Sequence, residues 1–339
     1  MFVIRSAQAT DIDALLDIAR HLDSVNLPNE RARLATILER STAAFSGRTT
    51  VAEREFVFVL EARESGKAAA IVGCSMLFAQ HGTRRAPHVY FDVLEEERYS
   101  DTIDRHFVHK VLRIGFNYKG VTEVGGLVLL PGHRGHPEQL GKLLSFVRFL
   151  YIARHRGLFA DDLLAELMPP LEPDGRSLLW ESLGRRFTGL DYQEADRLSR
   201  ENKEFIKALF PQEPLYASLL APEARALIGE VGAKSQGVAH MLRSIGFQYA
   251  HRIDPFDGGP HFHARTDDVI LVAQTQKKAV LSDTVVGDVL AIVGGEGSDG
   301  LFRAVRTRVV DEPFGAAMPA EVRMALDVDV GAEVSVLRL

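Results

Sequence analysis

The stretch VGGLVLLPGHRGHPEQLGKLLSFVRFLYIA, residues 124–153, decides the fold of this chain. It opens on the apolar run 127–130, which predicts a short buried strand. Pro131 and Gly132 end that strand and turn the chain. Apolar residues then recur at the spacing of a helix; they are Leu140, Leu143, Leu144, Val147, Leu150 and Tyr151. The stretch therefore predicts a buried strand, a basic loop with glycines, and a helix.

The start of this helix is a candidate anion site. The first N–H groups of a helix have no partner inside the helix and lie at the positive end of its dipole, so phosphate groups bind there readily. The backbone of the preceding strand can hold an extended ligand as an added strand would. The alternative is that the glycines only allow tight packing and the leucines are plain core. The candidate ligand-binding residues are Leu127, Leu129, Arg134, Gly135, Gly141 and Lys142.

Composition and charge narrow the class of protein. The chain has 339 residues, enough for two packed units. It is 46% apolar and 25% charged, as soluble globular proteins are, and its net charge of −6 argues against nucleic acid or a membrane as the main partner. We expect no signal peptide and no membrane span, and therefore a cytoplasmic protein. Cys74, the single cysteine, excludes a disulfide framework and is expected to be buried.

The order of predicted elements before this stretch is informative. A strand at 2–5 precedes a helix that starts near residue 12, and a second helix is predicted at 30–41. Strands follow at 56–60 and 68–78. This order, the opening V-I-R-x-A-x-x-x-D and the strand–loop–helix unit together resemble the acyl-CoA N-acyltransferases of the GNAT superfamily. The resemblance implies an α/β GNAT-like fold, in which the unit holds the pyrophosphate of coenzyme A.

The polar segment 80–119 is long for a plain connection and is therefore a candidate functional insertion. His106 and His109 lie three apart in a pattern that predicts a helix, which would place both on one side. The acidic run 95–97 predicts a solvated helix start. Because no third ligand accompanies the two histidines at a fixed spacing, we expect no metal site.

The remaining sequence predicts further α/β units. A strand is expected at 161–168, a helix within 174–187 that Asp174 or Ser177 caps, a helix and strand within 235–249, and a strand at 269–273. Short β-rich pieces fill 276–339. We expect three consecutive domains: a GNAT-like acyl-CoA-binding domain at 1–190, a second GNAT-like α/β unit at 191–275, and a small C-terminal β subdomain at 276–339. The GNAT-like fold is thus predicted to be elaborated or duplicated.

Several motifs in collinear order make the resemblance more specific. They resemble the arginine N-succinyltransferase family and include FVLE (58–61), GLVLLP (126–131), DGRSLLWESLGRRF (174–187), NKEFIKALFP (202–211) and IDPFDGGP (253–260). The resemblance implies succinyl transfer from succinyl-CoA, as a co-substrate and not a permanently bound cofactor, to the α-amine of arginine in arginine catabolism. It also places Leu127 on the family's acyl-CoA contact position.

Two departures from the family bear on chemistry. The loop at 132–140 is longer than the family's and lacks one of its glycines. The family's proton-donor histidine, in the motif I-G-x-V-H, is replaced by Gly232 in IGEVG (228–232). His240, off the apolar stripe of the next helix, is a candidate substitute; His88, Tyr99 and His251 are others that spacing cannot rank. No catalytic acid is therefore assigned.

Three hypotheses follow. The first is an acyl-CoA-dependent N-acyltransferase for arginine or another amine, whose rate Gly232→His should raise if only the proton donor is missing. The second is a non-catalytic or regulatory subunit that pairs with an active paralogue. The third is a sensor of CoA thioesters. The expected partners are acyl-CoA, an amino-acid acceptor and further subunits in a homo- or hetero-oligomer.

Overall fold

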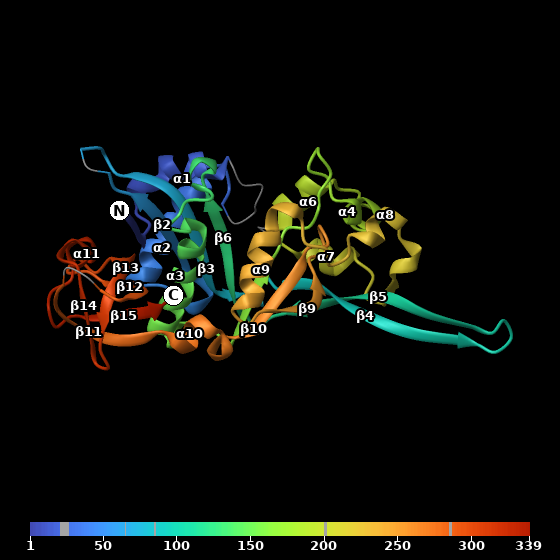
Figure 1. The fold of residues 1–339 in the computed structure, drawn as a ribbon. Coiled ribbons are helices and arrows are strands. Elements are labelled where there is room, and N and C mark those ends of the chain that lie inside the picture. The colour runs from blue at the N-terminus through green and yellow to red at the C-terminus, as the bar shows by residue number, and fades with distance from the viewer. Residues whose placement is uncertain (21–26, 65, 85, 200–201, 285–286) are drawn as a thin grey trace. The chain divides into compact units, whose positions relative to one another are not determined.

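The computed structural model describes residues 1–20, 27–64, 66–84, 86–199, 202–284 and 287–339. The chain forms two compact units (Figure 1). The first contains Met1–Gln80, Thr122–Asp161 and Arg265–Leu339, and the second contains His81–Val121 and Asp162–Ala264. This division differs from the predicted consecutive domains at 1–190, 191–275 and 276–339. Sequence patterns predict consecutive domains, whereas each unit combines segments that are distant along the chain.

The first unit is a mixed α/β structure. Its strands are hydrogen-bonded in the order β12-β15-β11-β14-β13-β1-β2-β3-β6. The strands are β1 (Phe2–Ser6), β2 (Glu55–Ala62), β3 (Ala70–His81), β6 (Val121–Leu129), β11 (Gln276–Asp283), β12 (Val289–Glu296), β13 (Phe302–Asp311), β14 (Gly315–Met318) and β15 (Glu333–Arg338). The helices are α1 (Ile12–Ala19), α2 (Arg31–Phe45), α3 (Leu140–Arg154), α10 (Ile270–Gln274) and α11 (Ala320–Leu326).

Most predicted elements of the first unit are present. Strands 2–5, 56–60 and 68–78 and the helix at 30–41 correspond to β1, β2, β3 and α2. Buried Cys74 on β3 confirms the expected burial. The strand predicted at 269–273 is wrong, because that apolar run forms α10 instead. A short apolar run fits a strand and a buried helical turn equally well by periodicity.

The C-terminal residues are β-rich as predicted, but they belong to the first unit. Strands β11 to β15 close on themselves because β12 pairs with both β15 and β13. Their interior is a cluster of small aliphatic residues that includes Val3 of β1. Strand β13 also pairs antiparallel with β1, with Val305 opposite Val3. The C-terminal strands thus extend the N-terminal sheet and share its core.

The second unit has its own sheet, in the order β7-β10-β9-β4-β5-β8, with a set of short helices. The strands are β4 (His88–Ser100), β5 (Arg105–Asn117), β7 (Asp162–Glu166), β8 (Leu215–Tyr216), β9 (Gln248–Ile253) and β10 (Pro260–Arg265). The helices are α4 (Leu178–Ser182), α5 (Gly184–Thr188), α6 (Tyr192–Ser199), α7 (Glu204–Leu209), α8 (Pro222–Ala226) and α9 (Gln236–Ser244).

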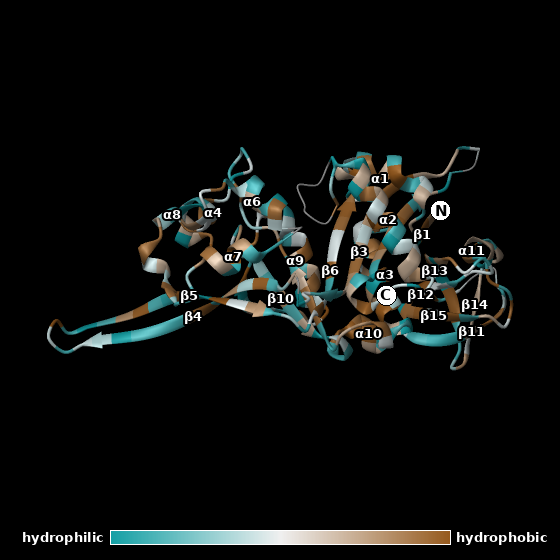
Figure 2. Cartoon of the chain, turned by 180° about the vertical axis from the view of Figure 1, so that it is seen from behind, coloured by the Kyte–Doolittle hydropathy of each residue, from teal (hydrophilic) through white to brown (hydrophobic). Residues whose placement is uncertain are grey.

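Segment 80–119 contains a long antiparallel hairpin, β4–β5, so the helix predicted there is wrong. Its outer part extends beyond the helices of the second unit and is mostly hydrophilic on β4 (Figures 1 and 2). The acidic run 95–97 lies within β4 and is not a helix start. Side chains alternate between the two faces of a strand, so His106 and His109 point to opposite sides rather than to one.

The packing of the second unit explains one distinctive motif. Ser177 caps α4 by accepting a 3.0 Å hydrogen bond from the Trp180 amide, as predicted. The Trp180 indole is fully buried and stacks on Phe256, with ring centroids 5.0 Å apart. A Cβ on Gly184 would lie only 2.3 Å from that indole. Close packing against Trp180 therefore explains the glycine at the end of WESLG (180–184).

Candidate functional site

The end of β6 and the start of α3 form the predicted strand–loop–helix unit. Every helix residue named for its apolar spacing is buried, so the predicted core face of α3 is confirmed. Pro131–His133 form a single 3-10 turn, and Gln139 enters α3 with a left-handed φ of 52°. Leu127 and Leu129 lie on β6 and are half-buried.

The two glycines of this unit leave open space at the helix start. Gly135 has a φ of 71°, and a Cβ built on it would meet nothing within 4 Å. Gly141 is the second residue of α3, and a Cβ there would touch only a Leu129 methyl at 4.0 Å. Packing inside the chain therefore does not require a glycine at 141. The missing side chain leaves room for a ligand to approach the first turn closely.

Both predicted cations of the unit are exposed and lie near this opening. Arg134 donates from Nε to the Leu129 carbonyl at 3.1 Å, which places its guanidinium at the end of β6. The ammonium of Lys142 lies over the Phe146 ring, 5.1 Å from its centroid. Two positive side chains beside a helix start that has no side-chain cap suit a phosphate-bearing ligand.

Sequence reasoning missed a buried cation behind the unit. Arg148 of α3 is almost fully buried and donates to the Gly125 carbonyl and to the Ser145 carbonyl and hydroxyl. Burial lowers its pKa to about 9. The neighbouring Gly126 has a φ of 57°, so β6 is irregular at this point. Arg148 thereby ties the irregular part of β6 to α3.

Gly232 occupies a tightly enclosed place in the second unit. Its amide donates to the Met168 carbonyl at 2.9 Å. A Cβ on it would lie 2.6 Å from the Pro169 carbonyl oxygen. Its φ is −61°, which any residue adopts, so the backbone angle does not exclude a side chain here. The obstacle to a side chain at 232 is the backbone of residues 168–169.

Among the substitutes proposed for the missing histidine, only His88 is buried beside a carboxylate. His240 lies on the exposed face of α9. Tyr99 is 59% exposed near the hairpin tip and donates to Asp104. His251 is exposed, with a φ of 52° on β9. The sequence prediction that singled out His240 therefore gains no support from its surroundings.

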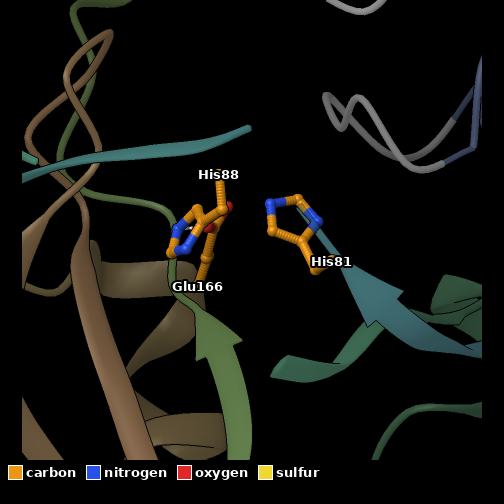
Figure 3. Close-up of side chains that lie close together, drawn as sticks. All are labelled: His81, His88 and Glu166. Carbon is orange, nitrogen blue, oxygen red and sulfur yellow. Dashed lines mark ion pairs between the residues drawn. The ribbon is translucent and has the colours of Figure 1, made fainter. Parts of the chain in front are cut away.

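The second unit gathers histidines around one carboxylate (Figure 3). Nε2 of His88, at the start of β4, lies 3.0 Å from Oε1 of Glu166, the last residue of β7. His81, the last residue of β3, has its ring centroid 4.7 Å from that of His88. His261 of β10 stacks on His88 at 5.1 Å and brings Nε2 to 3.4 Å from Glu166. We call His81, His88, Glu166 and His261 the histidine cluster.

Two members of the histidine cluster, His88 and His261, line a cavity of about 210 Å³ in the same unit. His88, His261, Asn117, Arg252 and His263 are among its lining residues. Burial lowers the pKa of His261 to about 3, so its imidazole is neutral at neutral pH. Burial and then the Glu166 charge raise the pKa of Asp254 to about 7. The arrangement can transfer a proton through the His88–Glu166 pair, or it can hold a cation.

No spacing in the sequence could have identified this cluster. All four members belong to the second unit, and His88, Glu166 and His261 lie on β4, β7 and β10, which are distant in sequence and come together only in one sheet. The local signal, such as a histidine that follows a proline in GGPHFH (258–263), is not specific for any chemistry.

Comparison with known proteins assigns the family. The model described as arginine N-succinyltransferase beta subunit matches residues 2–271. Arginine N-succinyltransferase subunit beta of Pseudomonas aeruginosa is 35% identical over 289 residues, which is 84% of this chain and 83% of that protein. Arginine N-succinyltransferase of Yersinia enterocolitica is 33% identical over 288 residues, covering 84% and 82%.

A solved structure shares the fold over its whole length. Arginine/ornithine succinyltransferase subunit AI from Pseudomonas aeruginosa aligns with a TM-score of 0.84 and 29% identity, over 100% of this chain and 98% of that one. The predicted α/β GNAT-like fold is thereby confirmed. In the described residues, no helix is long and apolar enough to cross a membrane. On these matches, the chain belongs to the arginine N-succinyltransferase family.

Proposed function

We propose that this chain transfers the succinyl group of succinyl-CoA to the α-amine of arginine, a reaction of arginine catabolism. The amine nitrogen forms an amide bond to the thioester carbonyl carbon, and the bond from that carbon to sulfur breaks. The amine loses a proton and the thiol of CoA gains one. Membership of the family supports the choice of substrates.

The observation that carries the proposal is the open glycine at the start of α3. The first turn presents N–H groups and the positive end of the helix dipole, and Arg134 and Lys142 lie beside it. We assign this opening to the pyrophosphate of the acyl-CoA. The backbone of β6 at Leu127 and Leu129 is assigned to the pantetheine arm, which would bind as an added strand does.

The second candidate is a subunit whose acid–base chemistry a paralogous chain supplies. One observation favours it: residue 232 is glycine, and the carbonyl of Pro169 leaves no room there for a side chain. Proton transfer by a positioned side chain contributes about 10²–10⁴-fold, so a chain that lacks it retains the catalysis that comes from holding the reactants together. The two candidates thus differ in the rate of the isolated chain.

Release of free CoA thiol tests the proposal. Purified chain is incubated with succinyl-CoA and, in turn, with arginine, ornithine and lysine. We expect arginine to stimulate thiol release most. Thiol release that no amine stimulates would contradict the proposed reaction.

A further inference from the structure

The histidine cluster contains the geometry of a metal site. One ligand atom from each of His81, His88 and Glu166 can be chosen so that all three lie within 4.8 Å of one another. Ligand bonds of about 2.0–2.2 Å around a tetrahedral zinc ion separate neighbouring ligand atoms by roughly 3.4 Å. The His88–Glu166 distance of 3.0 Å is close to that value. Figure 3 shows the His81 ring directed toward His88 and Glu166.

A second observation points to the same place. His261 is 0% exposed, and neither of its ring nitrogens makes a hydrogen bond within the described part of the chain. Its Nε2 approaches Oε1 of Glu166 at 3.4 Å, so it is aimed at the same carboxylate. A buried polar atom without a hydrogen bond is costly, and a bound ion is one of the few features that explain it in a native structure.

The kinds of residue agree with one class of ion. Two imidazoles and one carboxylate form the protein ligand set of several catalytic zinc enzymes and of non-haem iron sites. Arg252, a cation that lines the cavity beside the cluster, donates a 2.9 Å hydrogen bond to Asp92, so its positive charge is paired with a carboxylate.

We propose that His81, His88 and Glu166 bind one divalent transition-metal ion of the zinc class, with His261 beside it as a further donor. Glu166 is the shared ligand, since it also lies within 4.8 Å of ligand atoms of Asp254 and His261. The side chain of Glu166 is 28% exposed, so solvent reaches the site. The proposal does not rest on the proposed acyl transfer, because the experiment that tests it measures binding of the ion and not catalysis.

Titration of the full-length chain with Zn²⁺ and Co²⁺ tests the proposal. Chelator-treated protein is titrated by calorimetry, and the visible absorption of Co²⁺ reports low-coordinate ligation by imidazole. We expect one equivalent of ion per chain. His88→Ala and Glu166→Gln should each weaken binding at least about tenfold, the smaller effect known for supporting residues of metal sites. His81→Ala, at a half-buried position, is the variant least apt to disturb folding.

The matched control is His106→Ala. His106 also faces a glutamate, Glu97, at 3.5 Å in the same unit, but the pair is exposed and lies on the hairpin. This variant should bind the ion as the unaltered chain does. Binding well below one equivalent would overturn the proposal, as would binding that the three cluster variants leave unchanged. If Zn²⁺ does not bind and Glu166→Gln slows thiol release, the cluster is a proton-transfer site and the metal proposal is wrong.

Discussion

The amide of Gly232 donates a 2.9 Å hydrogen bond to the carbonyl of Met168, and this contact holds the glycine against a wall of backbone. A Cβ at 232 would come within 2.6 Å of one carbonyl oxygen and 3.0 Å of another. Real Cβ atoms do not approach backbone so closely, so any side chain at 232 must displace residues 168–169. The position at which the family resemblance implies a proton-donor histidine is thus closed to a side chain in this chain.

Gly232→His should therefore destabilise the protein and should not raise kcat. Overpacking of this kind costs about 1–3 kcal/mol. The expectation from sequence that this change restores the rate considered the missing proton donor but not the space. Thermal unfolding and thiol release from succinyl-CoA measure the two effects. Gly237→Ala is the control, since a Cβ at 237 meets nothing within 4 Å. A faster enzyme with an unchanged Tm would contradict this account of Gly232.

Gly141→Asp should abolish most of the stabilisation by acyl-CoA and leave the fold intact. An aspartate in the first turn of a helix is favourable for the helix, but its charge repels a phosphate bound there. A ligand that binds only the folded state raises Tm according to RT ln(1 + [L]/Kd). Thermal scans with and without succinyl-CoA measure the shift. Gly237→Asp is a matched control, because Gly237 is the second residue of α9 and is equally unobstructed. Equal shifts in both variants would remove the start of α3 as the CoA site.

Lys278→Met should destabilise the chain strongly. The ammonium of Lys278 contacts Asp311 where both side chains are only 1% exposed. Loss of one partner of a buried pair costs about 3–5 kcal/mol, and the low end is expected because Arg338 still contacts Asp311. Urea unfolding measures the change. Lys277→Met, which removes an exposed pair with Glu333, should cost about 1 kcal/mol or less. Similar losses for the two variants would mean that burial of the Lys278 pair has no energetic consequence.

Acid should remove the stability that Glu296 contributes. Burial alone would raise the pKa of Glu296, but hydrogen bonds from His155 and Arg154 outweigh it and lower the pKa to about 2. The contribution is therefore complete above the unfolded pKa of about 4.3 and is lost as pH falls toward 2. We expect the free energies of unfolding of the native chain and Glu296→Gln to differ at pH 6 and to converge near pH 2. Glu333→Gln is the control, an exposed partner of the same Arg154. A difference that does not change with pH would contradict the assigned role of the Glu296 charge.

The sequence predicted elements whose pattern is local. Helix α3 and strand β2 have apolar residues at the spacing or in the continuous run of a buried element, and both are present. The β4–β5 hairpin was mistaken for a helix, because its stability comes from cross-strand pairing that no local spacing records, such as His109 opposite Glu96. The same reason explains why the two units differ from the predicted consecutive domains. Strand β13 pairs with β1 although the two strands lie near opposite ends of the chain.

The two candidate sites, the start of α3 and the histidine cluster, also differ in how well the sequence predicts them. The start of α3 is one continuous stretch, so Arg134 and Gly141 could be named from their spacing. The histidine cluster depends on the ends of separate strands. Neither Glu166 nor His261 is marked by its neighbours in sequence, and only the pairing of β7 with β10 brings them together. Burial at 0% exposure is what makes His261 informative, and a sequence does not report it.

Mass spectrometry of the product made by this chain alone tests the central claim most directly. Purified protein is incubated with succinyl-CoA and arginine in the absence of any other subunit, and fragmentation locates the succinyl group. The account predicts arginine that is succinylated on its α-amine, in an amount that rises with enzyme and time. If succinyl-CoA raises Tm but no succinylarginine forms, the chain binds the co-substrate without performing the transfer, and the claim that it is an enzyme on its own is contradicted.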